Sequence, residues 1–477
     1  MLRDAAYVGG DWLRSGETAS VQDPASGEPI AAVAQCPVEV VDIAVAAAQA
    51  AFVDWRALLP RERGALLSRW GTLIRQNVED LATILTCEQG KPLVEARAEI
   101  AYAAEFVDWF AAEGERAYGE TLPPHKRDSQ IFVKVQPVGI VAAVTPWNFP
   151  CAMITRKAAA ALAAGCPVIV KPADETPLSA LALAQLAEQA GLPGGVFQVL
   201  TGEPGPLTGA LLAAPPVRAL SFTGSTRVGR LLSGQAASSI KLVSMELGGH
   251  APFIVFDDAR LDSVVQGALA AKFATSGQDC LAANRIYVQR RLYRDFVAAF
   301  AAEVSRLKVG HGLDPATQIG PMTHAGIAQN CRRQIADAVA GGARVVVGER
   351  DVMSDGGNFV SPTLLADVAD GMLISREETF GPVAAILPFD DEDEVIGRAN
   401  ASEMGLAAYV YTDDLRRGMR VSDRLEYGMV GVNTPSFTGA PIPFGGWKQS
   451  GLGREGSRHG LNAFTELKYV CLGDLAA

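Results

Sequence analysis

The stretch SGQDCLAAN, residues 276–284, places a cysteine between a carboxylate and a run of small apolar residues. A cysteine in a long chain is commonly a structural thiol that packs as a small hydrophobe. Cys280, however, follows small and polar residues directly after a predicted helix, so its sulfur lies outside an apolar run. A thiol at such a place can attack a carbonyl carbon when a base and an oxyanion donor lie near it. Residues elsewhere in the chain must decide between these two interpretations.

Glu246 and Asn148 could supply that base and that donor. Glu246, in SMELGGHAP, ends a predicted strand between apolar neighbours. Partial burial would raise its pKa and suit it to act as a base; the alternative is a solvated carboxylate at a strand end. Asn148, in TPWNFP, lies in a turn bounded by two prolines. Its amide either bonds to its own turn or is held as a donor to an oxyanion.

FTGSTRVG, residues 222–229, runs from a predicted strand into a helix. Its glycines, Gly224 and Gly229, resemble a dinucleotide-binding turn but lack the first two glycines at the usual spacing. The alternative is an ordinary glycine turn in which Ser225 caps the helix. In either case, the helix N-terminus can face a pyrophosphate.

VKPADETP, residues 170–177, ends another predicted strand with Lys171 and Asp174. These side chains lie at a strand carboxyl end, where an adenosine ribose would bind. The alternative is a surface turn that leads into a helix capped by Thr176.

These motifs require elements that bring strand ends together. Residues 138–249 alternate between short apolar strands and helices, which predicts a parallel sheet with its ligands at the carboxyl ends of the strands. A second α/β stretch follows over about 250–435, and residues 38–118 have apolar residues at helical spacing. The alternating segment 119–136 predicts a hairpin arm, and FTELKYVCLG predicts a strand. These two outlying segments are expected to pair with each other or with another subunit.

Composition narrows the class of protein. The 477 residues are 49% hydrophobic and 20% charged, as in ordinary globular chains of several domains. The formal net charge of -11 disfavours nucleic-acid binding. We expect no signal peptide and no membrane span, because no apolar stretch reaches about 18 residues. Seven widely spaced cysteines without a C-x-x-C motif predict neither a disulfide framework nor a metal site, and fit a reducing cytoplasm.

Seven motifs taken in order resemble the aldehyde dehydrogenase superfamily over essentially the whole chain: TPWNFP, VKPADETP, FTGSTRVG, MELGGHAP, GQDC, EETFGPV and PFGGWKQSGLGREG. Two longer stretches, PWNFPCAMITRKAAAALAAGCPVIVKPA and LGREGSRHGLNAFTELKYVCLG, look most like its succinate-semialdehyde dehydrogenase branch. The resemblance implies an α/β fold with a Rossmann-type parallel-sheet NAD(P)-binding domain (1–118 and 137–248) and an α/β catalytic domain (249–456). It also implies an oligomerisation arm (119–136 and 457–477), and hence a homodimer or homotetramer.

The resemblance also implies roles for individual residues. Cys280 matches the family nucleophile, Glu246 the general base and Lys157 a lysine near the active site. Asn148 and the backbone N–H of Cys280 match the oxyanion hole. The implied cofactor-binding residues are Thr145, Pro146, Trp147, Lys171, Ala173, Asp174, Gly202, Phe222, Gly224, Ser225, Gly229, Leu247, Glu378 and Phe380.

The implied reaction is NAD(P)-dependent oxidation of an aldehyde to an acid through a cysteine thiohemiacetal and a thioester, with succinate semialdehyde as the expected substrate. Another semialdehyde such as glutarate semialdehyde, an uncharged aldehyde, and a non-catalytic binding or structural homologue are the alternatives. A coenzyme A-acylating enzyme would need no water-activating base, so Glu246 speaks against it. Asp174 predicts a preference for NAD, with NADP possible, because a carboxylate repels the 2′-phosphate of NADP.

Three positions refine the substrate. Arg156 matches an arginine of the succinate-semialdehyde branch that would bind the carboxylate tail, and Thr438 keeps a hydroxyl where that branch has serine. Ala274 replaces a second arginine six residues before the nucleophile, which predicts weaker binding and tolerance of longer tails. Ala282 stands where related enzymes often carry another cysteine, so we expect no local disulfide switch at Cys280.

Overall fold

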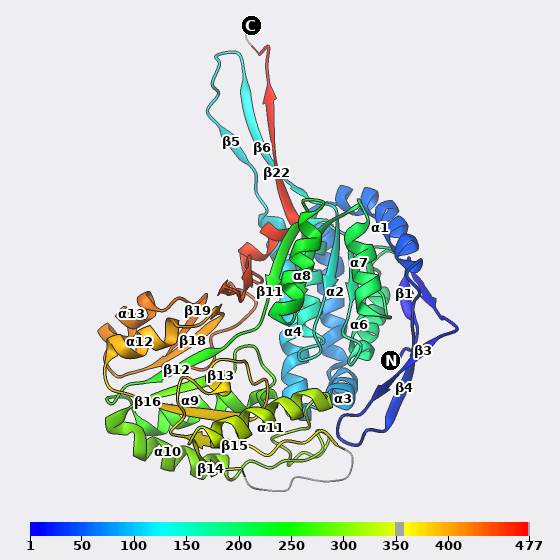
Figure 1. Cartoon of the computed structure of the whole chain (residues 1–477). Helices are drawn as coiled ribbons and strands as arrows, with labels where there is room; N and C mark the ends of the chain where they lie inside the picture. Colours follow the sequence, from blue (N-terminus) through cyan, green and yellow to red (C-terminus); the bar gives the residue numbers. More distant parts are fainter. Residues whose placement is uncertain (349–356, 476–477) are drawn as a thin grey trace.

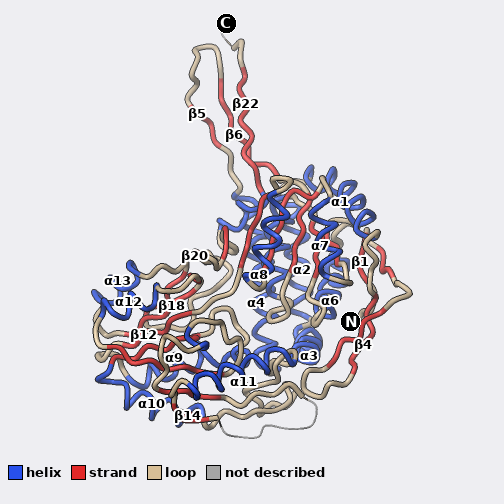
Figure 2. Tube along the Cα trace, viewed as in Figure 1, coloured by secondary structure: helices blue, strands red, loops and turns tan. Residues whose placement is uncertain are grey.

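The computed structural model describes residues 1–348 and 357–475, in two α/β bodies and a slender sheet that projects from one of them (Figure 1). The predicted catalytic domain therefore includes a segment outside the described residues, 349–356. The predicted arm ends outside them as well, at 476–477. Figure 2 shows that strands form the centre of each body and that helices cover them.

The first body contains an eight-stranded sheet in the order β2-β1-β9-β8-β7-β10-β11-β21. Its central strands are parallel, as the alternating pattern predicts: β7 (Ile140–Val144), β8 (Val168–Lys171), β9 (Phe197–Val199), β10 (Val217–Thr223) and β11 (Leu242–Glu246). Antiparallel strands complete both edges: β1 (Ala6–Val8), β2 (Asp11–Leu13) and β21 (Gly451–Leu452). The strand order reverses between β7 and β10, and ligands of doubly wound sheets bind at such a reversal.

Helices cover both faces of this sheet, and for that reason its strands are continuous apolar runs. Val141 and Ala143 face the core under α2, α4, α5 and α6, whereas Ile140 and Ala142 face the core under α1, α7 and α8. The helices are α1 (Val40–Ala57), α2 (Pro60–Gln76), α3 (Val78–Gln89), α4 (Leu93–Glu113), η1 (Gly114–Arg116), α5 (Ala152–Ala164), α6 (Pro177–Ala190), α7 (Pro204–Ala213) and α8 (Thr226–Ala237). A hairpin of β3 (Thr18–Gln22) and β4 (Pro29–Ala34) lies beside them.

The cap of α6 differs from the prediction. Thr176 is the N-cap residue, but its side chain makes no capping hydrogen bond. The carboxylate of Glu88, at the end of α3, accepts hydrogen bonds from the N–H groups of Leu178 and Ser179 instead, both at 2.8 Å. A buried carboxylate from a helix distant in sequence thus satisfies this helix end, and local sequence could not show it. Ser225 does cap α8, accepting a hydrogen bond from Val228 N.

The second body contains a seven-stranded sheet in the order β14-β15-β16-β13-β12-β18-β19, parallel except for β14 at its edge. Its strands are β12 (Ala251–Val255), β13 (Ala283–Gln289), β14 (Arg344–Val347), β15 (Thr363–Ala366), β16 (Val383–Phe389), β18 (Ala407–Tyr411) and β19 (Met429–Val432). Its helices are α9 (Leu261–Phe273), η2 (Ala274–Gly277), α10 (Arg290–Val304), α11 (Ala325–Ala340), η3 (Leu373–Ser375), α12 (Glu392–Asn400) and α13 (Leu415–Arg424). A short pair, β17 (Met404–Gly405) and β20 (Trp447–Lys448), and η4 (Arg458–Phe464) connect it back to the first body.

The projecting sheet has the order β22-β6-β5: β5 (Glu120–Leu122), β6 (Gln130–Pro137) and β22 (Thr465–Leu472). β22 pairs with the full length of β6, so the two outlying segments pair with each other as expected. Leu467 and Tyr469 are 73% and 57% exposed on this sheet.

Among the described residues, no single helix has both the length and the apolar character to cross a membrane. The pair α1–α2 meets those criteria only when its two helices, which are bent by 117° at the break, are taken together.

Candidate active site

The residues after β7, β8, β10 and β11 meet at the strand carboxyl ends, where the order of the first sheet reverses. Thr145 N donates to the carbonyl of Lys171 at 3.1 Å, and Gly224 N donates to that of Glu246 at 3.1 Å. These backbone bonds join neighbouring loops into one surface. Asn148, Lys171 and Gly224 therefore lie along one edge, as the parallel arrangement predicts.

Cys280 comes from the second body, on a loop that begins with an unusual backbone. Thr275 and Ser276 both have positive φ, 50° and 58°, and Gly277 follows at 74°. Residues with side chains adopt this conformation only when their surroundings hold them there. Thr275 N donates to both carboxylate oxygens of Glu95, at 3.0 and 3.1 Å, and Ser276 Oγ accepts from Gly320 N at 2.8 Å. The nucleophile loop is thus fixed from both bodies.

Cys280 lines two cavities. The first, of about 190 Å³, brings together nine predicted site residues from both bodies, among them Asn148, Glu378 and Phe380. Its lining is Pro146, Trp147, Asn148, Met153, Thr223, Gly224, Ser225, Leu247, Gly248, Cys280, Glu378 and Phe380. The rings of Trp147 and Phe380 meet edge to face across it, with centroids 5.3 Å apart.

The second cavity, of about 460 Å³, also contains the predicted substrate residues Arg156 and Thr438. Its lining is Lys91, Glu95, Ala98, Glu99, Tyr102, Phe149, Met153, Arg156, Ala274, Thr275, Asp279, Cys280, Leu281, Ser436, Thr438 and Phe444. Cys280 and Met153 are shared with the first cavity. The sulfur thus lies between a compartment built from predicted cofactor residues and one built from predicted substrate residues.

Asn148 is held in place at both ends. Its side-chain Nδ2 donates to the carbonyl of Gln278 at 3.1 Å, and its own carbonyl accepts from Lys91 Nζ at 2.8 Å. An amide nitrogen has two N–H groups, so the bond to Gln278 leaves one for a ligand. Asn148 is only 4% exposed, so any oxyanion that it meets is largely removed from water.

The Lys91 ammonium belongs to a buried ion pair that the sequence did not reveal. Lys91 Nζ lies 2.6 Å from Glu99 Oε2, and both side chains are almost fully buried. The other oxygen of Glu99 accepts from the N–H groups of Cys151 and Ala152, at the start of α5. Lys91 and Glu99, both in or next to α4, thus fix both sides of the turn that carries Asn148.

The surroundings of Cys280 disfavour its thiolate. Burial raises the pKa of the thiol well above the ordinary value, and the neighbouring Asp279 carboxylate raises it further, whereas the Arg156 guanidinium opposes both. Gly249, after β11, packs so closely that a Cβ there would lie 2.2 Å from the carbonyl oxygen of Cys280.

Glu246 is 2% exposed, and neither of its carboxylate oxygens has a hydrogen-bond partner among the described residues. Burial raises its pKa well above the ordinary range, and the nearby Glu455 carboxylate adds to this shift. The direction of this pKa shift matches the expectation from the apolar neighbours of Glu246, although the side chain is more deeply buried than expected. Glu246 lines neither cavity beside Cys280; its Oε1 faces Gly445, where a Cβ would lie 2.9 Å away.

Lys157 and Arg156 meet at Glu455, which lies within the motif PFGGWKQSGLGREG but has no local feature that marks it as a site residue. Arg156 Nε lies 2.6 Å from Glu455 Oε2, close but not aligned as a hydrogen bond, and Lys157 Nζ bonds to the other oxygen. Lys157 lines neither cavity, so it lies behind the site. Arg156 does line the larger cavity, and its guanidinium stacks 4.1 Å from the centroid of Phe444. Its charge, however, is partly offset by Glu455, which it shares with Lys157, whereas the sequence predicted a free tail clamp.

The remaining predicted cofactor residues divide into two groups. Lys171, Ala173, Asp174 and Gly202 line a small cavity beside the β3–β4 hairpin, and Lys171 Nζ lies 2.6 Å from Asp174 Oδ1. Thr145, Phe222 and Gly229 line none of these three cavities but support them. The Phe222 ring packs on Gly224, and a Cβ at Gly229 would lie 2.3 Å from Leu247 Cδ2.

These observations fit an extended dinucleotide. Lys171 and Asp174 offer a cation and an exposed carboxylate to a ribose, and the 12-residue helix α8 directs its N-terminus toward the first cavity. The Glu378 carboxyl faces the same cavity and accepts a hydrogen bond from Gly249 N at 3.1 Å. Burial raises the pKa of Glu378 to about 7.

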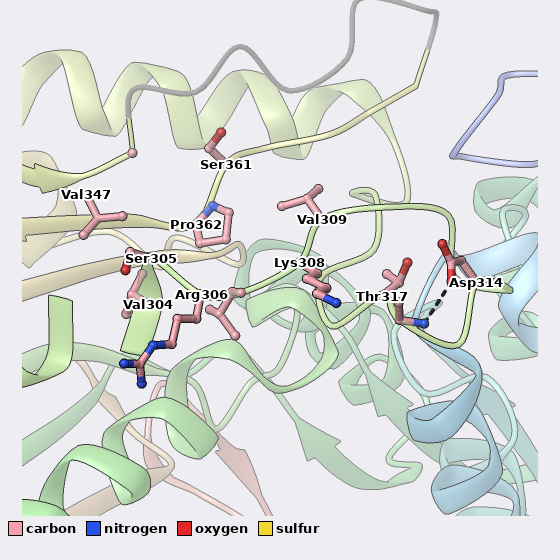
Figure 3. Close-up of a pocket in the computed structure, with 13 residues that line it drawn as sticks. Val304, Ser305, Arg306, Lys308, Val309, Asp314, Thr317, Val347, Ser361 and Pro362 are labelled. Atoms are coloured by element: carbon pink, nitrogen blue, oxygen red, sulfur yellow. Dashed lines mark hydrogen bonds between the residues drawn. The ribbon is translucent and has the colours of Figure 1, made fainter. Parts of the chain in front are cut away.

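A cavity of about 430 Å³ lies between the end of α10 and β14, and its described lining contains no cysteine, no histidine and no predicted site residue (Figure 3). Its Arg306 pairs with Glu303 at 2.6 Å. Within 1–348 and 357–475, no group of three or more His, Cys, Asp or Glu residues is arranged to hold a metal ion.

Comparisons with known proteins agree with this geometry. The model of the "Aldehyde dehydrogenase family" matches residues 12–470. The chain is 52% identical to a non-phosphorylating aspartate-semialdehyde dehydrogenase of Halomonas elongata, covering 100% of this chain and 97% of the relative. It is 51% identical to a glutarate-semialdehyde dehydrogenase of Pseudomonas aeruginosa (100% and 99%), and 50% identical to the NADP(+) succinate-semialdehyde dehydrogenase GabD of Escherichia coli (99% and 98%).

Solved structures give the same result. An aldehyde dehydrogenase of Brucella melitensis biovar abortus superposes with a TM-score of 0.97 at 50% identity, covering 99% of this chain and 98% of that one. The NAD+ complex of an aldehyde dehydrogenase from Bacillus cereus superposes with a TM-score of 0.96 at 35% identity, covering 99% and 96%.

Proposed function

The chain belongs to the aldehyde dehydrogenase family, and we propose that it oxidises a semialdehyde to the dicarboxylic acid, with succinate semialdehyde as the reference substrate. The family oxidises aldehydes with NAD or NADP. The observation that carries the proposal is the position of Cys280, which lines both the cavity of cofactor-type residues and the cavity of substrate-type residues.

The Cys280 thiol is proposed to release its proton to solvent, and its sulfur then attacks the aldehyde carbon to form a thiohemiacetal. The second N–H of the Asn148 amide and the backbone N–H of Cys280 would then hold the oxyanion, which can contribute several kcal/mol in a water-excluded site. The nicotinamide cofactor, when bound, supplies the hydride acceptor that turns the thiohemiacetal into a thioester. Lys171, Asp174, Ser225 and Glu378 would hold that cofactor.

Hydrolysis of the thioester is assigned to Glu246. Its raised pKa makes it a stronger base than an exposed glutamate once it is ionised. Because it lines neither cavity, its side chain must turn toward Cys280 before it can take a proton from water. Water then attacks the thioester carbon, the C–S bond breaks, and the thiol and the acid are released.

The domain limits given by the resemblance remain part of the proposal: 1–118 and 137–248 for cofactor binding, 249–456 for catalysis, and 119–136 with 457–477 for assembly. The exposed Leu467 and Tyr469 and the free edges of β5 and β22 support a homodimer or homotetramer formed through the projecting sheet. We also place the protein in the cytoplasm, because all seven cysteines are free.

The test follows formation of reduced nicotinamide with succinate semialdehyde, glutarate semialdehyde and butanal, with NAD or NADP, in the presence and absence of coenzyme A. We expect both semialdehydes to be oxidised faster than butanal, without a requirement for coenzyme A. Cys280→Ser is the control for the chemistry. A wild type that prefers butanal would refute the semialdehyde assignment, and a dependence on coenzyme A would refute hydrolysis by Glu246.

A further inference from the structure

The charged groups around the larger cavity do not balance. Two cations line it, Lys91 and Arg156, and each already has a carboxylate 2.6 Å away, Glu99 and Glu455 respectively. All four of these side chains are buried, so these pairs are poorly screened by water. Glu455 also pairs with Lys157, so it cannot offset both of its cations. Lys91 is therefore fully paired, whereas the Arg156 side keeps positive charge for a substrate carboxylate.

Two other carboxylates line the same cavity without such a partner. Asp279 and Glu95 have no lysine, arginine or histidine nitrogen within 4.0 Å among the described residues. The Glu95 oxygens accept hydrogen bonds from Thr275 N, and Asp279 Oδ1 accepts one from Leu281 N at 2.9 Å. Backbone N–H groups orient both carboxylates but do not neutralise their charge. The Asp279 side of the cavity therefore has an excess of negative charge.

The position of Asp279 makes this excess relevant to the substrate. It precedes Cys280 in the chain and lines the same cavity, so a tail bound there would lie near its carboxylate. A tail with only a carboxylate would meet repulsion there, while Ala274 supplies no cation to offset it. An ammonium group on the tail would instead give the buried charges their missing partner.

We propose that Asp279, assisted by Glu95, makes this cavity selective for an aldehyde that carries a protonated amine as well as a carboxylate, that is, a 2-amino semialdehyde. The inference rests on the proposed semialdehyde oxidation and names its substrate class more closely. The carboxylate of the substrate would lie on the side of Arg156 and Thr438, and its ammonium on the side of Asp279.

The test compares two substrates that differ by a single group. Aspartate semialdehyde is succinate semialdehyde with one hydrogen replaced by an ammonium group, so the ratio of their kcat/KM values isolates that group. We expect the wild type to prefer aspartate semialdehyde and Asp279→Asn to lower the ratio about tenfold or more, as for loss of a charge-assisted bond. Effects of the substitution on Cys280 reactivity cancel in the ratio, because both substrates react at the same aldehyde.

Glu95→Gln is the matched control, since it neutralises a second carboxylate in the same cavity. Burial raises the pKa of Glu95 to about 7, so this group is only partly ionised at neutral pH. We therefore expect a smaller fall in the ratio than for Asp279→Asn. An equal or larger fall would transfer the selective role to Glu95 and overturn the assignment to Asp279.

A second measurement needs no semialdehyde activity. Methanethiosulfonate reagents with a trimethylammonium or a sulfonate tail inactivate a thiol at rates that report the local potential, here read as loss of butanal oxidation. The cationic reagent should inactivate the wild type faster than the anionic one, and Asp279→Asn should reduce that difference. Unchanged ratios in both experiments, or a wild type that prefers succinate semialdehyde, would overturn the inference. A wild type that oxidises butanal but neither semialdehyde would refute the proposed function. In that case, the inactivation rates of the two reagents would still test whether the cavity is negatively charged.

Discussion

Replacing Lys91 by methionine should separate positioning from stability in this active site. Met fills a similar volume but removes the ammonium that holds the Asn148 carbonyl at 2.8 Å and Glu99 at 2.6 Å. Breaking a buried ion pair on one side costs about 3–5 kcal/mol. Glu99 keeps its two backbone N–H donors at 2.9 and 3.2 Å, so we expect the lower end of that range.

The expected change in Tm follows from the length of the chain, and the expected change in kcat follows from the role of Asn148 as an oxyanion donor. At about 2.1 cal/mol/K per residue, a chain of 477 residues unfolds with an entropy of about 1 kcal/mol/K, so about 3 kcal/mol lowers Tm by about 3 °C. Removing an oxyanion donor outright lowers kcat by about 10²–10³-fold. Lys91→Met displaces Asn148 rather than removing it, so we expect a fall in kcat of about 10–100-fold with little change in KM.

Two further variants test whether Lys91 acts through Asn148. Adding Glu99→Gln removes the unpaired charge and should restore much of the lost Tm but not kcat, because the Asn148 carbonyl still lacks its donor. In an Asn148→Ala background, Lys91→Met should lower kcat no further, since both changes remove the same interaction. If the two losses in kcat simply multiply, or if kcat recovers together with Tm, Lys91 does not act through Asn148.

Three other predictions concern the chemistry. Cys280→Ser should abolish dehydrogenase activity. Glu246→Gln should give one burst of reduced cofactor per site, seen by rapid-mixing absorbance, and then stall at the thioester, seen by intact mass. Steady turnover of either variant would contradict the assigned roles. Burial raises the pKa of Glu246, and only its ionised form is a base. The deacylation rate should therefore still rise with pH above the pH range in which an ordinary glutamate titrates. A deacylation rate independent of pH in that range would argue for another base. Asp174→Ser should shift the ratio of kcat/KM values from NAD toward NADP by freeing Lys171, and a wild type markedly faster with NADP would show that the ribose assignment is wrong.

Motifs at strand ends were predictable from the sequence, because a parallel sheet brings its carboxyl ends together wherever the strands fall in the chain. Asn148 and Gly224 meet for this reason, whereas Cys280 reaches them from the second body, on the loop before β13. Contacts between distant buried charges were not predictable. Glu455 lies 298 residues after Lys157, and nothing in the local pattern of either residue indicates the other. The consequence for function is direct, because this pairing takes up part of the charge that sequence alone assigned to a substrate tail.

In two places, contacts between elements distant in sequence determine the local structure, and the local sequence does not. The alternative interpretation of VKPADETP made Thr176 the cap of α6, yet the carboxylate of Glu88 from α3 takes that role. The left-handed backbone at Thr275 and Ser276 has no local cause, since neither residue type favours it. It exists because Glu95 and Gly320 hold it from two sides.

The second body is inserted into the first, and this has a mechanical consequence. The chain leaves the first sheet after β11, builds β12 to β19, and returns to the first sheet at β21, which pairs with β11. The two bodies are therefore joined by two covalent crossings rather than one, so neither body can turn freely about a single linker. Gly249, in the first crossing, packs on the Cys280 carbonyl, so this crossing also fixes the backbone that carries the reacting sulfur.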